Sequence, residues 1–300
     1  MSEPVESFPF ARLDEIRRRP ADFRLLERVP LTLAGIADYL PLQLNEPVDH
    51  ERVHQAIFLD TETTGTNYDR DKIMELGMVR ATYSFDRRLI LSVDAIYDEL
   101  EDPLRPIPEE IQKITHITNE MVAGHKINQE KVASWLNDKP LVIAHNAAFD
   151  RPFFENRFPE LDKFSWACSL KGVDWDAFGH SGSKLEYLLL CRGWFYEAHR
   201  ASTDCLALLW LMYTEPGAFG MLIDSALKPS FRLLAKGSPF EIKDTLKQKG
   251  YKWDAPARVW YRNCESREDA EQSLQELRGL YDARNAVIEE SNASTRFKHK

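Results

Sequence analysis

The stretch HQAIFLDTETTG at 54–65 decides the fold class of this chain. Residues 54–60 are a short apolar run that ends in an acid, which predicts a buried β-strand. Gly65 ends the polar segment after it, as is typical of a loop. Asp60 and Glu62 are two residues apart, so their side chains point to the same side of an extended chain. We therefore expect both carboxylates at one edge of a sheet.

Predicted strands and helices alternate after this stretch. Apolar residues recur at helical spacing in KLEYLLLCRGW and STDCLALLWLMY, and a helix is also expected in FDRPFFENRF. Strands interleaved with helices in this way indicate an α/β domain. Further strands are predicted at 72–84, 89–98, 141–145 and 166–173.

Changes in composition divide the chain into four parts. Residues 1–52 form an N-terminal extension with an amphipathic helix broken near Pro20; a solvated surface helix is favoured over one that contacts a partner or nucleic acid. Residues 53–228 form the α/β domain. A strand, a helix, a hairpin and a second helix at 229–284 predict a small C-terminal α/β accessory domain. The basic tail at 285–300 is expected to be disordered.

The charge of the chain restricts the classes of function. The net charge of −9 argues against a sequence-reading DNA-binding protein, because such proteins are usually basic. It does not exclude a nuclease. Clustered carboxylates bind metal ions, and the metal ions then supply the positive charge that meets a phosphate.

Location can also be predicted from composition. No apolar run is long enough to span a bilayer, and MSEPVESFPF lacks the apolar core of a signal peptide. The four cysteines are scattered without the spacing of a zinc site, so we expect reduced and mostly buried thiols. These features predict a cytoplasmic protein that contacts no membrane.

Four acids lie at the ends of predicted elements rather than on solvated faces. Asp60 ends the first strand, and Glu62 follows it. Asp150 comes just after the strand at 141–145, and Asp204 lies in the first turn of a later helix. Carboxylates at strand ends converge where α/β sheets commonly place their sites. Two carboxylates about 4 Å apart repel by roughly 4 kcal/mol at an effective dielectric of about 20, so the cluster predicts counter-ions.

The residue types favour a particular pair of cofactors and a general base. Oxygen ligands favour two Mg²⁺ or Mn²⁺ ions over zinc. Two such ions can stabilise both the attacking and the leaving oxygen of a phosphodiester displacement. His199 lies five residues before Asp204, and a histidine is the natural proton acceptor near neutral pH.

Three motifs carry a family resemblance. DTETTG at 60–65, HNAAFD at 145–150 and HRASTD at 199–204 resemble the motifs of the DEDDh (DnaQ-like) exonucleases, a family that includes the proofreading subunits of bacterial replicative DNA polymerases. The segment PLRPIPEEIQKITHITNEMVAG resembles the connection that usually follows the third strand in that family. Three motifs in order, each on its predicted element, are far more specific than one. The resemblance covers residues 53–215.

The resemblance implies a fold and a set of roles. The fold would be an RNase H-like mixed sheet flanked by helices, with an antiparallel meander of three strands followed by strands parallel to the first. Asp60 would bridge both metals, Glu62 and Asp204 would complete the shell of the first, and Asp150 would hold the second. His199 would activate the attacking water. Cleavage from the 3′ end would release nucleoside 5′-monophosphates.

Other residues near the motifs have two interpretations each. The resemblance implies that backbone groups near Thr63 and Thr64 meet the terminal nucleotide. His145 is expected to brace the strand end, with substrate contact as the alternative. Phe149 is expected in the core, with stacking on a base as the alternative. Glu75 is expected to support the second strand, with substrate contact as the alternative.

The accessory domain carries aromatic residues that also allow two interpretations. These residues lie on a predicted hairpin, beside basic neighbours, and an aromatic platform of this kind binds single-stranded nucleic acid. Because a small domain needs its aromatics for its only core, the core interpretation is favoured. The residues are Tyr251, Trp253, Trp260 and Tyr261.

Three functions remain as alternatives. The first is a DNA 3′→5′ exonuclease acting on single-stranded or 3′-ended DNA, alone or with a polymerase or repair partner. The second is an RNase T-like exonuclease acting on RNA; TTG at 63–65 and HNAAFD favour DNA. The third is a non-catalytic nucleic-acid-binding subunit, although all four acids and the histidine are present.

Overall fold

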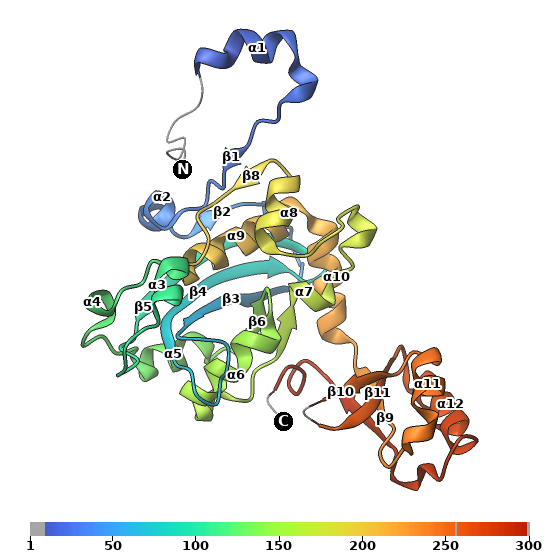
Figure 1. Ribbon diagram of the computed structural model, residues 1–300. Helices are drawn as coiled ribbons and strands as arrows, with labels where there is room; N and C mark the ends of the chain where they lie inside the picture. The colour runs from blue at the N-terminus through green and yellow to red at the C-terminus, as the bar shows by residue number, and fades with distance from the viewer. Residues whose placement is uncertain (1–9, 256, 299–300) are drawn as a thin grey trace.

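The computed structural model describes residues 10–255 and 257–298, and its main domain is built on a six-stranded mixed sheet (Figure 1). The strand order is β2-β5-β4-β3-β6-β7. Strands β3, β4 and β5 form an antiparallel meander, and β6 and β7 continue the sheet in parallel with β3. This is the arrangement that the resemblance implied. The strands are β2 Leu42–Gln43, β3 Val53–Thr63, β4 Ile73–Ser84, β5 Leu89–Leu100, β6 Leu141–Ala144 and β7 Trp166–Cys168.

Helices cover both faces of this sheet, and each face has its own core. Phe58 of β3 packs in the core that includes α8, α9 and α10, whereas Ile57 and Leu59 pack in the core that includes α5 and α6. Because β3 is covered on both faces, its residues are apolar in a continuous run rather than in alternation. The helices are α5 Gln129–Leu136, α6 Ala147–Arg157, α8 Leu185–Cys191, α9 Ala201–Thr214 and α10 Pro216–Leu227.

Short helices fill the connections between these elements. The proline-rich segment after β5 turns helical directly after Pro108. With Met74 of β4, this segment encloses a small third core. The predicted strand at 166–173 ends earlier, at Cys168, and gives way to a helical turn. These helices are α3 Glu109–Thr115, α4 Asn119–Val122 and α7 Ser169–Gly172.

The N-terminal extension is more closely joined to the main domain than predicted. Helix α1, Leu13–Arg18, is exposed and breaks before Pro20 as expected. However, β2 pairs with the β5 edge of the central sheet, and β1, Glu27–Arg28, pairs in parallel with β8, Trp194–Phe195. A strand that covers a sheet edge satisfies its free backbone groups, which explains why β2 belongs to the main domain. The helical turn α2 spans Leu33–Ile36.

Residues 230–291 form a separate C-terminal module with its own antiparallel sheet and core. Its strand order is β10-β11-β9-β12, with helices α11 and α12 packed against the sheet. The side chain of Ser266 accepts a hydrogen bond from the backbone of Asp269, which caps the start of α12. The module consists of β9 Ser230–Leu234, α11 Lys243–Gln248, β10 Lys252–Asp254, β11 Val259–Cys264, α12 Arg267–Arg278 and β12 Val287–Ser291.

The prediction of a disordered tail at 285–300 is wrong for residues 287–298. Strand β12 lies inside this range and pairs with β9. Beyond it, the chain returns to the main domain, where the backbone carbonyl of Ala293 accepts a hydrogen bond from the backbone of Trp166 at 2.8 Å. The buried guanidinium of Arg151 donates to the carbonyls of Ser294 and Arg296, each at 2.6 Å. These tertiary contacts order a segment whose composition alone indicates disorder; the last two residues lie outside the described ranges.

Two further predictions concern the thiols and the membrane. All four cysteines are free; Cys191 is exposed and the other three are buried. Within the described ranges, no single helix is long and apolar enough to cross a bilayer. Helices α9 and α10 reach the required length and composition together, but they meet at a bend of 106°.

Candidate active site

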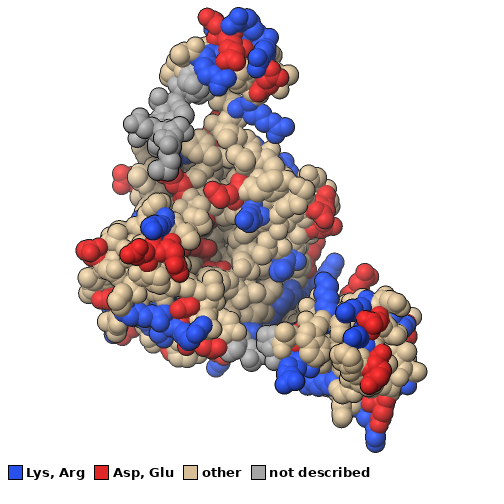
Figure 2. Space-filling model, in the orientation of Figure 1, with Lys and Arg blue, Asp and Glu red and all other residues tan. Residues whose placement is uncertain are grey.

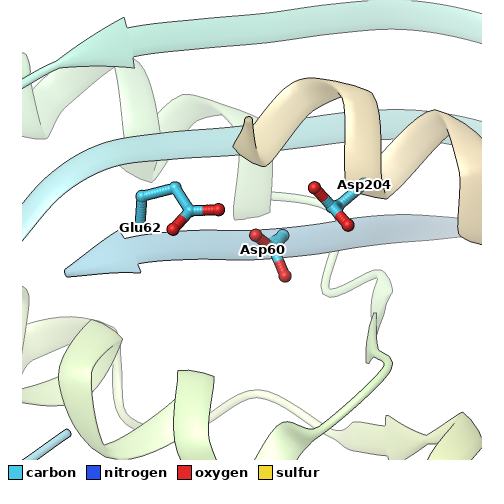
Figure 3. A group of neighbouring side chains, drawn as sticks. All are labelled: Asp60, Glu62 and Asp204. Atoms are coloured by element: carbon cyan, nitrogen blue, oxygen red, sulfur yellow. The ribbon is translucent and has the colours of Figure 1, made fainter. Parts of the chain in front are cut away.

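Two carboxylates of β3 meet a third from α9 (Figure 3). One ligand atom from each of Asp60, Glu62 and Asp204 lies within 4.8 Å of the others. Because side chains alternate along a strand, Asp60 and Glu62 both point to the face that α9 covers. The structure therefore brings together three acids that the sequence singled out.

The carboxylate of Asp204 is held by three donors. The Tyr196 hydroxyl donates to Oδ1 at 2.8 Å. The backbone N–H groups of His199 and Arg200 donate to Oδ2 at 2.8 and 3.2 Å. These bonds fix the direction in which Asp204 faces the β3 carboxylates. Tyr196 was not identified from the sequence, because it lies before the HRASTD motif and no local pattern marks it.

Asp150 approaches from the opposite side of the sheet. It lies in the first turn of α6, and its Oδ1 accepts hydrogen bonds from the backbone N–H and the hydroxyl of Thr61 at 3.1 and 3.0 Å. Thr61 stands between Asp60 and Glu62 and points to the α6 face. The residue that separates the two β3 acids thus anchors the fourth carboxylate at the same strand end.

All five predicted catalytic residues line one cavity of about 220 Å³. Its walls come from the end of β3, the start of α6 and the start of α9. His145, Asn146 and Phe149 also line it, whereas Thr63 and Thr64 lie beyond its lining.

Burial makes the carboxylates of this cavity resist ionisation. It raises the pKa of Asp60 well above its usual value, and the charges of Asp150, Asp204 and Glu62 raise it further. Burial, with the charges of Asp204 and Glu75, raises the pKa of Glu62 to about 8. Burial also raises the pKa of Asp150 to about 7, against the hydrogen bonds from Thr61.

Asp204 follows the same rule. Burial raises its pKa, while the bonds from Tyr196 and His199 oppose the rise. A buried set of carboxylates that repel one another is favourable when cations lie between them. The donor set consists of carboxylate oxygens, which are the ligands of hard divalent cations, so the residues fit such ions.

His199 occupies an unusual backbone position at the cavity mouth. Its φ is 71°, in the left-handed region that non-glycine residues seldom adopt, and its side chain is exposed. The residue lies directly before α9, and its N–H bonds the Asp204 carboxylate. That bond helps to maintain the strained backbone and leaves the imidazole open to solvent at the cavity.

The predicted substrate-binding residues differ in what they are free to contact. Both ring nitrogens of His145 are engaged, with the Ser169 hydroxyl at 2.8 Å and the Ser183 carbonyl at 2.7 Å. Burial lowers the pKa of His145 to about 4, so it is a neutral brace for the strand end. Phe149 lines the cavity and also packs against Phe153, with ring centroids 5.0 Å apart.

Thr63 and Thr64 form hydrogen bonds within the loop that follows β3. The backbone N–H of Thr64 donates to the Lys72 carbonyl at 2.9 Å, and the hydroxyl of Thr63 donates to the Gly65 carbonyl at 2.6 Å. A contact of Thr63, Thr64 or Phe149 with substrate stays a prediction.

Glu75 holds the start of α9 and was underestimated from the sequence. Its side chain is fully buried directly across from Glu62 on β4. It accepts hydrogen bonds from the Arg200 guanidinium and the Ala201 N–H, each with a contact at 2.8 Å. Glu75 thus positions the helix that carries Asp204. Glu75 could be seen in the MELG segment of the sequence, but its hydrogen-bond partner Arg200 lies 125 positions later in the chain.

Gly77 allows α9 to approach the sheet. A Cβ at this position would lie 2.3 Å from the Ala201 carbonyl carbon and 2.4 Å from the Ser202 nitrogen. Backbone atoms cannot move aside as a flexible side chain can. Glycine is therefore required where β4 passes under the first turn of α9.

Carboxylates gathered at the end of a central strand can hold divalent cations against a phosphate, and the histidine beside them can accept a proton. The fold and the cavity therefore define a nuclease. Among nucleases, the chain belongs to the exonuclease family, whose model matches residues 57–212, more than half of the chain. It is a 3′→5′ exonuclease, and the predicted DEDDh resemblance is confirmed.

Individual relatives agree with this assignment. The DNA polymerase III subunit epsilon of Treponema pallidum (strain Nichols) is 30% identical over 202 residues, which cover 62% of this chain and 88% of the relative. The PolC-type DNA polymerase III of Lacticaseibacillus paracasei is 28% identical over 156 residues, which cover 51% of this chain and 10% of the relative. The chain thus spans about a tenth of that polymerase.

A solved structure of exonuclease I has the same fold. It superposes with a TM-score of 0.51 at 15% identity, and the match covers 77% of this chain and 72% of that chain. The RNase H-like mixed sheet with flanking helices, predicted from the sequence, is therefore confirmed.

Proposed function

We propose that this chain removes nucleotides from the 3′ end of DNA in a reaction that depends on divalent cations and releases nucleoside 5′-monophosphates. The observation that carries the proposal is the convergence of Asp60, Glu62 and Asp204, with Asp150 and His199 lining the same cavity. Carboxylates so close together suit cation binding and hydrolysis of a phosphodiester better than a non-catalytic binding role. The chain also retains every residue that an inactive relative would be expected to lose.

The carboxylates divide into two sets of ligands in this proposal. Asp60 would contact both cations, Glu62 and Asp204 would complete the shell of one, and Asp150 would serve the other. Two Mg²⁺ or Mn²⁺ ions, when bound, would supply charge neutralisation at the phosphate and activation of the attacking water. The oxygen donor set favours these hard cations over zinc.

The chain's own side chains would position the reacting groups and move the proton. The His199 imidazole, open at the cavity mouth, would accept a proton from the attacking water. Tyr196 and the N–H groups of His199 and Arg200 would keep Asp204 in a fixed direction. Phe149 would face the terminal base from the cavity wall.

DNA is the proposed substrate because the two curated relatives described above are DNA polymerase III components. A replicative or repair polymerase is the proposed partner on the same ground. A cytoplasmic location stays a prediction.

Digestion of end-labelled oligonucleotides tests the proposal. Single-stranded DNA, duplex DNA and RNA of one sequence are incubated with Mg²⁺, with Mn²⁺ and with chelator, and products are identified as nucleoside mono- or oligophosphates. We expect monophosphates from the 3′ end of DNA, faster than from RNA, and no products in chelator. Asp60→Ala should remain folded by circular dichroism and lose cleavage. Cleavage in chelator, or full activity in that variant, would refute the assignment.

A further inference from the structure

The C-terminal module contains an open groove of about 700 Å³ that its own core does not fill. The groove lies between the hairpin β10–β11 and the segment that runs from Phe240 into α11. We refer to it as the aromatic groove. The side chains that define it are Phe240, Lys243, Lys247, Trp253, Arg258 and Trp260.

Aromatic rings are exposed in this groove. Phe240 is 74% exposed and Trp253 is 49% exposed. Trp253 stands directly across from Trp260 in the hairpin, with ring centroids 5.5 Å apart. Tyr251, by contrast, is buried in the module core. The core interpretation of the hairpin aromatics therefore holds for Tyr251 and in part for Trp260, but not for Trp253.

The charge of the groove complements a phosphate backbone. The described residues that line it include three cations and no carboxylate. Lys243 lies 4.0 Å from the centre of the Phe240 ring. Neither Lys243 nor Arg258 forms an ion pair with a carboxylate of the described residues, and Lys247 pairs with an exposed one, Asp244, at 3.8 Å.

The module as a whole differs in charge from the rest of the chain. Residues 230–291 contain 11 Lys and Arg against 11 Asp and Glu, whereas the chain has a net charge of −9. In Figure 2, Lys and Arg side chains gather where the module meets the main domain. The module thus lacks the excess of acidic residues that the rest of the chain carries.

A second hollow lies next to the aromatic groove and reaches the main domain. A cleft of about 940 Å³ lies between the two parts of the chain, lined by Ala148 and Pro152 of α6. From the module, both cations and carboxylates line it: Arg232, Lys236, Asp254, Glu289 and Glu290. Val259 lines both this cleft and the aromatic groove. The residue after Ala148, Phe149, lines the catalytic cavity. Helix α6 therefore borders both hollows.

We propose that the aromatic groove binds single-stranded DNA, holding the strand 5′ to the nucleotide that is being cleaved. Exposed rings beside unpaired cations bind bases by stacking and phosphates by charge, without reading the sequence. This inference rests on the proposed exonuclease function, because the active site supplies the 3′ end that the strand would extend from. A protein partner would use the exposed rings but has no need for a groove free of carboxylates.

Binding and cleavage by the full-length chain test this proposal. Binding of a fluorescent single-stranded DNA of about 30 nucleotides is measured in chelator, and cleavage in Mg²⁺ is measured on that oligonucleotide and on a dinucleotide. We expect Trp253→Ala to weaken binding of the oligonucleotide about ten-fold, within the range known for loss of one stacking partner. Trp253→Phe should restore most of the affinity. Hydrolysis of the dinucleotide, which is too short to reach the groove, should not change.

Charge reversal provides an independent measurement with a matched control. Lys243→Glu should weaken binding and reduce the dependence of log K on log salt by about one unit or more. Arg278→Glu makes the same charge change on α12, away from the groove, and should have a much smaller effect.

The outcomes separate the inference from the function on which it rests. Unchanged affinity of Trp253→Ala and Lys243→Glu for single-stranded DNA would overturn the inference. Equal loss of oligonucleotide and dinucleotide hydrolysis would also overturn it, because the change would then be structural. Tighter binding of RNA than of DNA through Trp253 would overturn the assignment of DNA. A wild-type chain that cleaves neither substrate would refute the proposed function instead.

Discussion

At the residue scale, the site is a set of carboxylates that the fold holds together against their own repulsion. Burial and the charges of Asp204 and Glu75 oppose the ionisation of Glu62, and burial does the same for Asp150. The sequence identified all four acids and His199 because each lies at the end of an element. It did not identify Tyr196, whose hydroxyl bonds Asp204, since only the folded chain brings the two side chains together.

The role of His199 leads to the first prediction at this scale. His199→Ala should lower kcat on DNA by about 10²–10⁴-fold, the usual contribution of a general base. Cation affinity, measured by titration calorimetry, should change little because the imidazole is not among the proposed ligands. His125→Ala, at an exposed histidine away from the cavity, is the control. Loss of cation binding in His199→Ala would assign the residue to the metal site instead.

A second residue-scale prediction concerns pH. The pKa of Glu62 is about 8 in the folded chain and has its ordinary value of 4.5 in the unfolded chain, so between these values only the folded chain keeps the proton. The cation-free protein should therefore lose stability as pH rises toward 8. Burial lowers the pKa of His145 from 6.5 to about 4, so stability should rise with pH below pH 6.5 on account of this histidine. Between pH 6.5 and 8, the change in stability should therefore come from the carboxylates and not from His145.

Thermal unfolding over this interval measures the effect. The Tm in chelator should fall from pH 6.5 to 8, and Mn²⁺ should raise the Tm more at pH 8, where the carboxylates are more easily ionised. Glu62→Gln should flatten the dependence. A Tm in chelator that rises with pH would show that these carboxylates are not buried together.

At the scale of elements, helix α9 brings the HRASTD motif to β3. Its first turn is fixed on β4 by bonds from Arg200 and Ala201 to Glu75, and by the close passage over Gly77. The helix and its apolar face could be predicted from local spacing. The contacts that fix the helix on β4 could not be predicted, because Glu75 and Gly77 look like ordinary residues of a strand until their partners are known.

Gly77→Ala tests the close contact between α9 and β4. The added Cβ would meet backbone atoms at 2.3 Å and should cost about 1–3 kcal/mol of stability as overpacking. It should also lower kcat by about ten-fold or more, because a small displacement of α9 moves Asp204. Urea unfolding and steady-state kinetics measure the two effects. Gly220→Ala in α10, where the nearest atom is a side-chain carbon at 3.5 Å, should be close to neutral in both.

At the scale of the whole molecule, the chain end ties the C-terminal module to the main domain. After β12 the backbone passes Arg151, a fully buried residue of α6 next to Asp150. The guanidinium also pairs with Glu155 at 2.7 Å. The helix that carries Asp150, a proposed ligand of a divalent cation, therefore also carries the residue that anchors the last segment.

Arg151→Ala should release this segment. Removing the guanidinium leaves buried carbonyls and Glu155 without their partner, and we expect a loss of about 3–5 kcal/mol. Limited proteolysis should then cut near residues 292–298 while residues 53–228 stay protected, and urea unfolding gives the stability. Arg17→Ala, at an exposed pair with Asp14, should change stability by less than about 1 kcal/mol. An uncut tail in Arg151→Ala would mean that other contacts hold it.

The sequence by itself determined the α/β class and the five catalytic candidates, since these depend on local periodicity or on residues at element ends. The antiparallel meander followed by parallel strands was implied by the family resemblance. Tertiary structure decided the features that depend on distant partners. It added β2 to the sheet edge, seated α9 on Glu75 and Gly77, and ordered residues 287–298 through β9 and Arg151. It also left Trp253 exposed on β10 and buried Tyr251, because Tyr251 lies before the strand and packs against Leu246 of α11.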